Sequence, residues 1–135
     1  MRKKKVNAIK SFALLVVLGT AAMAQKATTP YPNMSYPNMA PIEQYLMERT
    51  AEIALARSAA PESIARDAEV LVLGRHGFET AVKSENGFVC IVERSWTSAP
   101  DADFWNPKVR TPICYNAAAS RSVLLRNLKR TDLIL

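Results

Sequence analysis

The sequence predicts an α+β fold in which an N-terminal amphipathic helix packs on a small three-stranded antiparallel meander, with a helix near the C-terminus. Apolar residues recur with helical spacing between Pro41 and Ala59. Three strand-like runs joined by two glycine-containing turns occupy the segment between Glu69 and Ser95. An asparagine suited to capping precedes a second helical pattern over Ala117–Leu128.

Residues 1–24 have the three parts of a secretory signal peptide. A basic segment, Met1–Lys10, precedes the apolar run Phe12–Leu18, and Ala22-Met23-Ala24 is a small-x-small cleavage pattern. We predict cleavage between Ala24 and Gln25, giving an exported protein that is periplasmic or secreted. An uncleaved anchor is the alternative, but the stretch from residue 12 to 24 has 13 residues, and a membrane span needs about 20.

The signal peptide accounts for most of the chain's net charge of +6. Five of the 18 basic residues lie within the first ten positions, and no acidic residue precedes Glu43. The remaining chain has 13 basic against 12 acidic residues, a net charge of +1. We therefore expect no nucleic-acid partner, and no stable membrane insertion once the signal peptide is removed.

The predicted export determines how we interpret the two cysteines, Cys90 and Cys114. In an oxidising compartment a lone pair of cysteines indicates one disulfide. A loop of this length would stabilise the fold by roughly 3–4 kcal/mol. Two free thiols, or pairing with another chain, are the alternatives.

Residues 25–40 form a predicted proline-rich, flexible linker before a single small domain over residues 41–135. The linker repeats the tetrapeptide Tyr-Pro-Asn-Met at 31–34 and 36–39. Its prolines favour extended backbone and exclude a helix. A recognition peptide that docks on a groove is the alternative interpretation.

The helix predicted over Pro41–Ala59 begins with a proline suited to a first turn. Its apolar stripe is imperfect because Arg49 interrupts it, and its acidic residues fall mostly away from the stripe: Glu43, Glu48 and Glu52. Pro61 ends this helix and begins a short one that runs through Ala65.

The meander begins with the apolar run Val70–Leu73, typical of a buried strand. A turn at Gly74–Gly77 leads to a half-buried strand in which Phe78, Thr80 and Val82 alternate with more polar neighbours. Asn86-Gly87 is a strong hairpin signal, and it predicts that the next strand, Phe88–Val92, pairs with the strand before it.

The rest of the chain returns to this sheet. A loop over Thr97–Thr111 carries Phe104 and Trp105, which we expect to fold back onto the core. Pro112–Tyr115 brings Cys114 to the sheet. The helix over Ala117–Leu128 has Val123, Leu124 and Leu128 as its apolar face, and Leu133–Leu135 predicts the start of a further strand.

Arg75-His76-Gly77 directly follows an apolar strand and resembles the histidine phosphatase signature. That resemblance implies His76 as the phosphorylated nucleophile and Arg75 as a phosphate ligand. Phosphatase chemistry needs a second histidine and a helix after the motif, whereas His76 is the only histidine and a hairpin follows. The preferred interpretation is a surface turn from which Arg75 and His76 project into water, and the phosphatase is the alternative.

No other pattern assembles a catalytic, cofactor or metal site, and we expect no cofactor. A disulfide removes both thiols from nucleophilic or metal chemistry. The remaining candidates are carboxylates expected to be solvated, Glu43, Glu48, Glu52, Asp101 and Asp103, and a basic cluster favoured by the helix dipole, Arg121, Arg126, Lys129 and Arg130.

Three segments resemble a group of uncharacterised exported bacterial proteins: Gly87–Trp96, Phe104–Lys108 and Pro112–Cys114. The resemblance implies export from a bacterium and no particular activity. Members of that group extend beyond the position matching Leu135, so one alternative is a truncated N-terminal part whose functional site lies further on. The preferred hypothesis is a non-catalytic binding or structural module.

Overall fold

A computed structural model describes residues 36–135. The predicted signal peptide, its cleavage site between Ala24 and Gln25, and most of the predicted linker lie outside the described residues.

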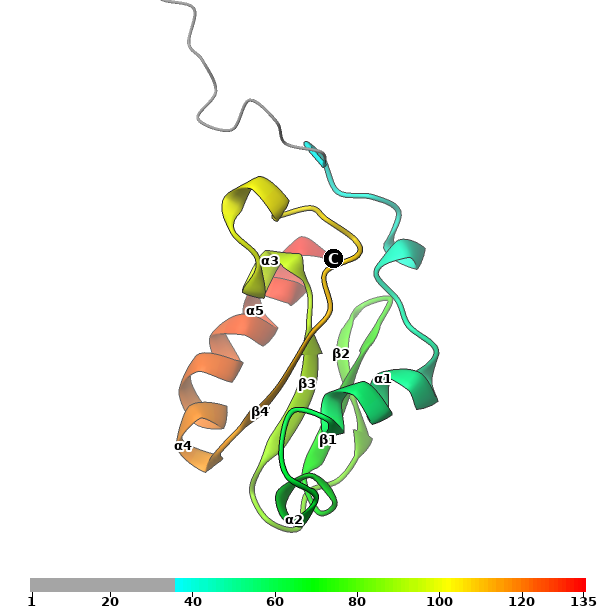
Figure 1. Cartoon of the computed structure of the whole chain (residues 1–135). Helices are drawn as coiled ribbons and strands as arrows, with labels where there is room; N and C mark the ends of the chain where they lie inside the picture. The colour runs from blue at the N-terminus through cyan, green and yellow to red at the C-terminus, as the bar shows by residue number, and fades with distance from the viewer. Residues whose placement is uncertain (1–35) are drawn as a thin grey trace, which may run out of the picture.

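The architecture is α+β, as the sequence predicts, with one mixed sheet between helices (Figure 1). The elements before the sheet are helical: η1 (Ile42–Gln44), α1 (Arg49–Arg57) and α2 (Glu62–Ala65). The strands are β1 (Glu69–Gly74), β2 (Gly77–Val82), β3 (Val89–Glu93) and β4 (Thr111–Tyr115). Two short helices, α3 (Ser95–Ser98) and η2 (Asp101–Asp103), lie between β3 and β4. The last elements are α4 (Ala117–Ala119), a π-helical turn η3 (Ser120–Leu124) and α5 (Leu125–Ile134).

The sheet has four strands in the order β2-β1-β3-β4, so the predicted three-stranded antiparallel meander is wrong. β1 and β2 form the predicted antiparallel hairpin, but β3 pairs in parallel with β1 on its other side. Every residue of β3 is buried, whereas β2 exposes Glu79 and Thr80. A strand covered on both faces belongs at the centre of a sheet, and β3 takes that position.

Asn86-Gly87 therefore lies in the loop that leads from β2 across β1 to β3, rather than in the turn of a hairpin. Gly87 adopts φ 78°, and its amide donates to the Ser84 hydroxyl. The Asn86 side-chain amide donates to the carbonyl of Ile64, which fastens the loop to α2. These bonds carry the chain past the beginning of β1, so the same turn-forming residues support a different topology.

A β-bulge also alters the predicted alternation in β2. Val82 lies opposite Val70 while Thr80 lies opposite Leu71, which leaves Ala81 without a partner. As a result Ala81 and Val82 both pack against the cluster beneath α1, and Phe78 packs on the opposite side of the sheet.

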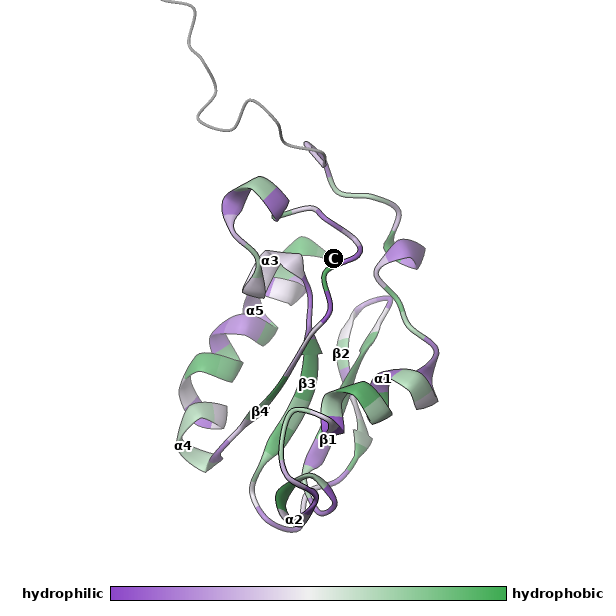
Figure 2. Ribbon diagram, viewed as in Figure 1, coloured by the Kyte–Doolittle hydropathy of each residue, from purple (hydrophilic) through white to green (hydrophobic). Residues whose placement is uncertain are grey.

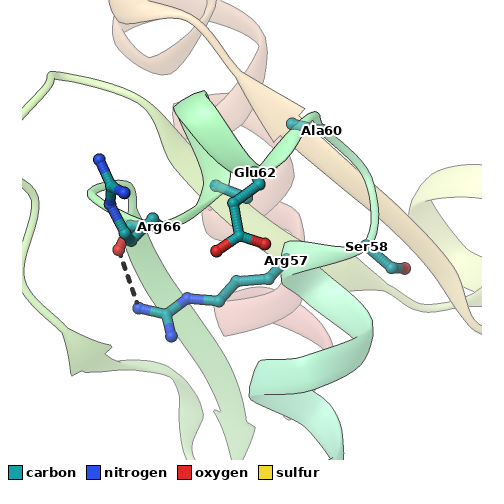
Figure 3. Close-up of a pocket in the computed structure, with 6 residues that line it drawn as sticks. Arg57, Ser58, Ala60, Glu62 and Arg66 are labelled. Carbon is teal, nitrogen blue, oxygen red and sulfur yellow. Dashed lines mark hydrogen bonds between the residues drawn. The ribbon is translucent and has the colours of Figure 1, made fainter.

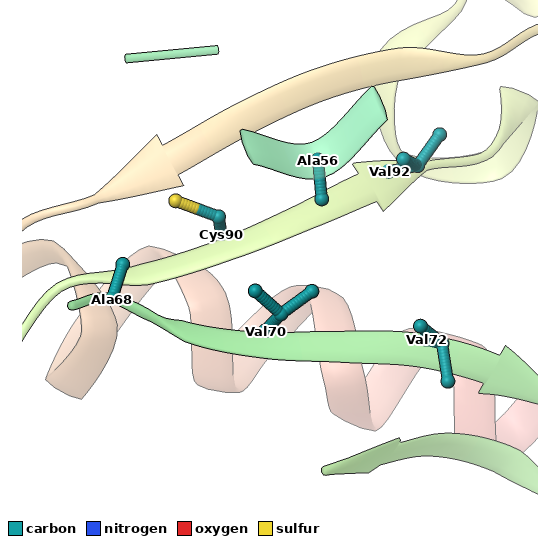
Figure 4. Close-up of a cluster of buried hydrophobic side chains, with 6 residues drawn as sticks. All are labelled: Ala56, Ala68, Val70, Val72, Cys90 and Val92. Atoms are coloured by element: carbon teal, nitrogen blue, oxygen red, sulfur yellow. The ribbon is translucent and has the colours of Figure 1, made fainter. Parts of the chain in front are cut away.

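The two faces of the sheet are covered by different helices (Figure 1). One core lies between the sheet and α1, and Figure 4 shows its buried members: Ala56, Ala68, Val70, Val72, Cys90 and Val92. The other core joins the sheet to the continuous helix over residues 117–134, called here the C-terminal helix, through Leu71, Val89, Ile91, Tyr115 and Leu124. Alternate residues of β1 and β3 point to opposite faces, as the strand period requires.

The helix predicted over Pro41–Ala59 is broken into η1 and α1. Glu48 has extended backbone and caps α1, because its carboxylate accepts from the amides of Thr50 and Ala51. The break lets Tyr45 reach a cluster at one end of the sheet with Leu73 and Trp96. One straight helix cannot cover both that end and the sheet face. Pro61 precedes α2 as predicted.

The C-terminal helix begins as predicted and is longer than predicted. The Asn116 side chain caps it by accepting from the amides of Ala118 and Ala119. Leu124 is buried and Leu128 is half-buried, but Val123 of the predicted apolar face is exposed. The strand predicted at Leu133–Leu135 is wrong, because the helix continues to Ile134 and the amide of Leu135 still donates to the carbonyl of Thr131.

The predicted disulfide between Cys90 and Cys114 is present. The two cysteines lie directly opposite each other on β3 and β4. Pro112 and Ile113 belong to β4, so this segment does return the second cysteine to the sheet. The disulfide fastens the edge strand β4 to the centre of the sheet.

Candidate functional site

The Arg75-His76 turn joins β1 to β2 and is open to solvent. Gly77 closes the turn with φ 124°, a conformation that requires glycine. The Arg75 guanidinium forms an ion pair with Glu43. A backbone hydrogen bond and, after it, the hydrogen bond from Arg75 lower the pKa of the Glu43 carboxyl. A strand rather than a helix follows the turn, so the arrangement that the phosphatase resemblance implies is not assembled around His76.

The carboxylates considered as catalytic candidates are dispersed. Glu43 and Glu48 serve the ion pair and the helix cap described above, and Asp103 accepts from the side-chain amide of Asn106. Asp101 and Asp103 both belong to the short helix η2. Within residues 36–135, no group of three or more histidine, cysteine or acidic side chains could hold a metal ion.

Glu52 is the exception to the expected solvation, because its side chain is 1% exposed. Its carboxylate lies 2.8 Å from the guanidinium of Arg94 and also accepts from the backbone amide of Leu73. Arg94 further donates to the carbonyls of Tyr45 and Val92. Burial lowers the pKa of Arg94 to about 10, against the opposing attraction of Glu52.

A second buried polar cluster joins β3 and β4 to the C-terminal helix. The Tyr115 hydroxyl donates to Glu93, and the side-chain amide of Asn127 donates to the same carboxylate oxygen at 2.7 Å. Burial and the hydrogen bond to Glu93 raise the pKa of Tyr115. Both clusters are buried, and most of their polar atoms form hydrogen bonds with other atoms of the protein. They therefore act as structural connections rather than as a reaction site.

A third connection holds the last turns of the C-terminal helix. The indole of Trp96 donates to the hydroxyl of Thr131 at 3.0 Å, and that hydroxyl donates to the carbonyl of Asn127. Arg130 donates to the carbonyl of Trp96. From the sequence we expect Glu52 to be solvated, and the other buried polar residues are not identified. The charged pair Glu93-Arg94, for example, resembles a solvated strand end in the sequence.

A cavity of about 420 Å³ opens between α1 and α2 (Figure 3). It is lined by Arg57, Ser58, Ala60, Glu62, Ala65 and Arg66. Arg57 donates to the carbonyl of Arg66, and the Ser58 hydroxyl donates to the carbonyl of Leu55. The lining holds cations and an anion together but no base beside the Ser58 hydroxyl, so it lacks the parts of a nucleophilic site.

The outward side of the C-terminal helix has a different composition. We define the outer helix face as Arg121, Val123, Leu125, Arg126, Lys129 and Leu133, all of which are exposed. Leu125 is 56% exposed and Leu133 is 76% exposed. Figure 2 shows apolar and hydrophilic segments interleaved along this helix. Large side chains this exposed, surrounded by cations, form a mixed surface suited to binding.

The outer helix face is predominantly positively charged. The C-terminal helix carries four basic residues and a single acidic one, Asp132. Asp132 is exposed, and its carboxylate lies close to Gly77 in the β1–β2 turn. Within the described part of the chain, none of the ion pairs involves Arg121, Arg126 or Lys129.

The sequence contains the signal for this face, although the predicted helix stopped at Leu128 and so left out Lys129 and Leu133. Leu125, Lys129 and Leu133 are spaced four residues apart, so they share one side of a helix. Asn127 and Thr131 are buried on the other side. Extending the helical period beyond Leu128 would have placed Leu133 on the same outward side as Leu125.

None of the helices described in residues 36–135 is long and apolar enough to cross a membrane. Comparison of the chain with models of protein families, with curated proteins and with solved structures finds no match.

Proposed function

We propose that this protein is an exported, disulfide-stabilised domain that acts by binding, through the outer helix face, rather than by catalysis. The observation that carries the proposal is the exposure of Leu125 and Leu133 among cations that join none of the ion pairs described in residues 36–135. Solvent exposure of two leucines at the centre of a helix face has no stabilising role in an isolated domain.

Export is supported by the leader-like composition of residues 1–24 and by the Cys90–Cys114 disulfide. Disulfides persist in oxidising compartments and are rare in the bacterial cytosol. The resemblance to exported bacterial proteins agrees with this location, since its segments contain both cysteines.

The rigid attachment of the C-terminal helix supports a binding role. Its buried side is fixed by Asn127 and Thr131 through hydrogen bonds to β4, β3 and Trp96. A helix held in this way presents its outer side chains with little further ordering when a partner binds, which reduces the entropic cost of association.

Site-specific photocrosslinking in cells that export the protein tests the proposal without assuming a partner. A photoreactive residue at Leu133 is expected to give crosslinked products, whereas the same residue at the exposed position Lys83 is expected to give few. The exported product should begin at Gln25. Equal crosslinking at the two positions, or a product retained in the cytoplasm that begins at Met1, would contradict the proposal.

A further inference from the structure

We infer that the outer helix face binds the surface of an anionic lipid bilayer. The inference rests on the proposed function, because it names the partner of the same face. It concerns attachment to one surface, and differs from insertion across the membrane.

The charge of the face favours an anionic partner. Arg121, Arg126 and Lys129 take part in none of the ion pairs described in residues 36–135. Asp132 is the single acidic residue of the C-terminal helix, and its carboxylate lies close to the Gly77 turn, so positive charge is in excess. Basic side chains beside an anionic membrane are attracted by its surface potential, and this attraction extends over about a Debye length.

The leucines favour a lipid surface over a purely polyanionic partner. Leu125, Lys129 and Leu133 form one row along the helix, four residues apart. If the helix lies in the plane of the membrane, both leucines reach the boundary between headgroups and acyl chains. The long stem of Lys129 lets its ammonium group remain among the phosphates while its methylenes stay near the leucines.

A second copy of the chain is a poorer occupant for the same face. In a two-fold pairing of outer helix faces, Arg126 and Lys129 of one copy would approach the cations of the other. Like charges placed together across an interface disfavour association. A single acidic residue, Asp132, lies beside these cations, so opposite charge is too scarce to compensate.

Vesicle sedimentation with the purified exported protein tests the inference. N-terminal sequencing must first establish that residues 1–24 are absent, because their apolar run would itself bind lipid. The probes are vesicles of pure phosphatidylcholine and vesicles of equal parts phosphatidylglycerol and phosphatidylcholine. Binding is expected only to the anionic vesicles, and it should weaken as ionic strength rises.

Two matched pairs of substitutions separate the charge from the apolar contribution. Arg126→Gln with Lys129→Gln should lower partitioning about 30-fold, or roughly five-fold for each cation. Lys83→Gln with Lys108→Gln removes the same charge from exposed positions outside the face and should change partitioning far less. Leu125→Gln with Leu133→Gln should lower partitioning roughly ten-fold or more. Circular dichroism and melting will show whether each variant is folded.

The outcomes distinguish this inference from the proposed function. Equal binding to both kinds of vesicle, or equal loss in the two charge variants, would overturn the lipid assignment. A dimer that Leu125→Gln with Leu133→Gln dissociates would overturn it in favour of a second copy. Photocrosslinking at Leu133 to a protein alone, with no vesicle binding, would overturn it while leaving the binding function intact. If the protein binds no vesicles and no crosslinked product forms at Leu133, both the lipid assignment and the proposed binding function would be contradicted.

Discussion

The guanidinium of Arg94 lies 2.8 Å from the carboxylate of Glu52, and both side chains are almost completely excluded from solvent. The pair joins α1 to the end of β3, and Arg94 also holds the carbonyl of Tyr45 in the segment before α1. The segment before α1, α1 itself and the distant end of β3 therefore meet at a single buried ion pair.

Removing one charge of this pair should strongly destabilise the protein. Glu52→Gln leaves the buried Arg94 cation without its counter-ion, and we expect the free energy of unfolding to fall by about 3–5 kcal/mol. Denaturant unfolding measures the change. Glu79→Gln removes a carboxylate from the exposed ion pair with Arg49 and should cost less than about 1 kcal/mol. Similar losses in the two variants would contradict a special role for the buried pair.

The hydroxyl of Thr131 should contribute measurably to the attachment of the C-terminal helix. Thr131→Val keeps the shape of the side chain but removes the acceptor for the Trp96 indole, at an expected cost of about 1–3 kcal/mol. Thr131→Ser keeps the hydroxyl and should lose less stability. Tryptophan fluorescence followed through thermal unfolding measures both variants, and equal stability of valine variant and wild type would refute the prediction.

The Cys90–Cys114 disulfide should make stability sensitive to reductant. Unreduced, denatured protein should have no titratable thiol, and reduction should lower the free energy of unfolding by about 3 kcal/mol. Melting with and without dithiothreitol measures this difference. A variant in which both cysteines are replaced by alanine serves as the control, because its melting should not respond to the reductant.

Tyr115 should make the protein less stable in alkali. Its pKa is raised by burial and by the hydrogen bond to Glu93, so the folded state keeps a proton that the unfolded state releases above about pH 10. The stabilisation is complete below that pH and declines as pH rises, by up to about 1.4 kcal/mol per pH unit. Denaturant unfolding at increasing pH measures the slope. Tyr115→Phe should flatten it, and an unchanged slope would contradict the assignment.

His76 should be dispensable for both stability and any hydrolysis of phosphate esters. His76→Ala alters an exposed turn, and we expect a change in unfolding free energy of less than about 0.5 kcal/mol. Wild type and variant should show the same background rate on a generic phosphomonoester. Turnover by the wild type that the substitution abolishes would restore the phosphatase interpretation.

The elements were largely predictable from local sequence, and their pairing was not. The apolar run in β1, the Gly74–Gly77 turn and the Asn116 cap each follow from nearby residues. The partner of β3 depends on which strand needs cover on both faces, a property of the whole sheet. The hairpin signal at Asn86-Gly87 is local and was therefore misleading.

The candidate site was predictable only in part. The basic residues of the C-terminal helix are evident in the sequence, but the place of Leu133 on the outer helix face depends on the helix continuing to Ile134. That continuation is supported by the bond between Trp96 and Thr131, residues 35 positions apart. A short terminal segment with leucine and isoleucine has no local preference strong enough to choose helix over strand.

By itself, the sequence determined the α+β class, the Asn116 cap, the Gly74–Gly77 turn and a cysteine pair suited to one disulfide, because these depend on local periodicity and composition. Only the tertiary structure decided the parallel pairing of β1 with β3, the burial of Glu52 with Arg94, and the exposure of the outer helix face. Those features depend on contacts between segments distant in the chain. Their contribution to the stability of the fold is set by packing in the shared core rather than by neighbouring residues in the sequence.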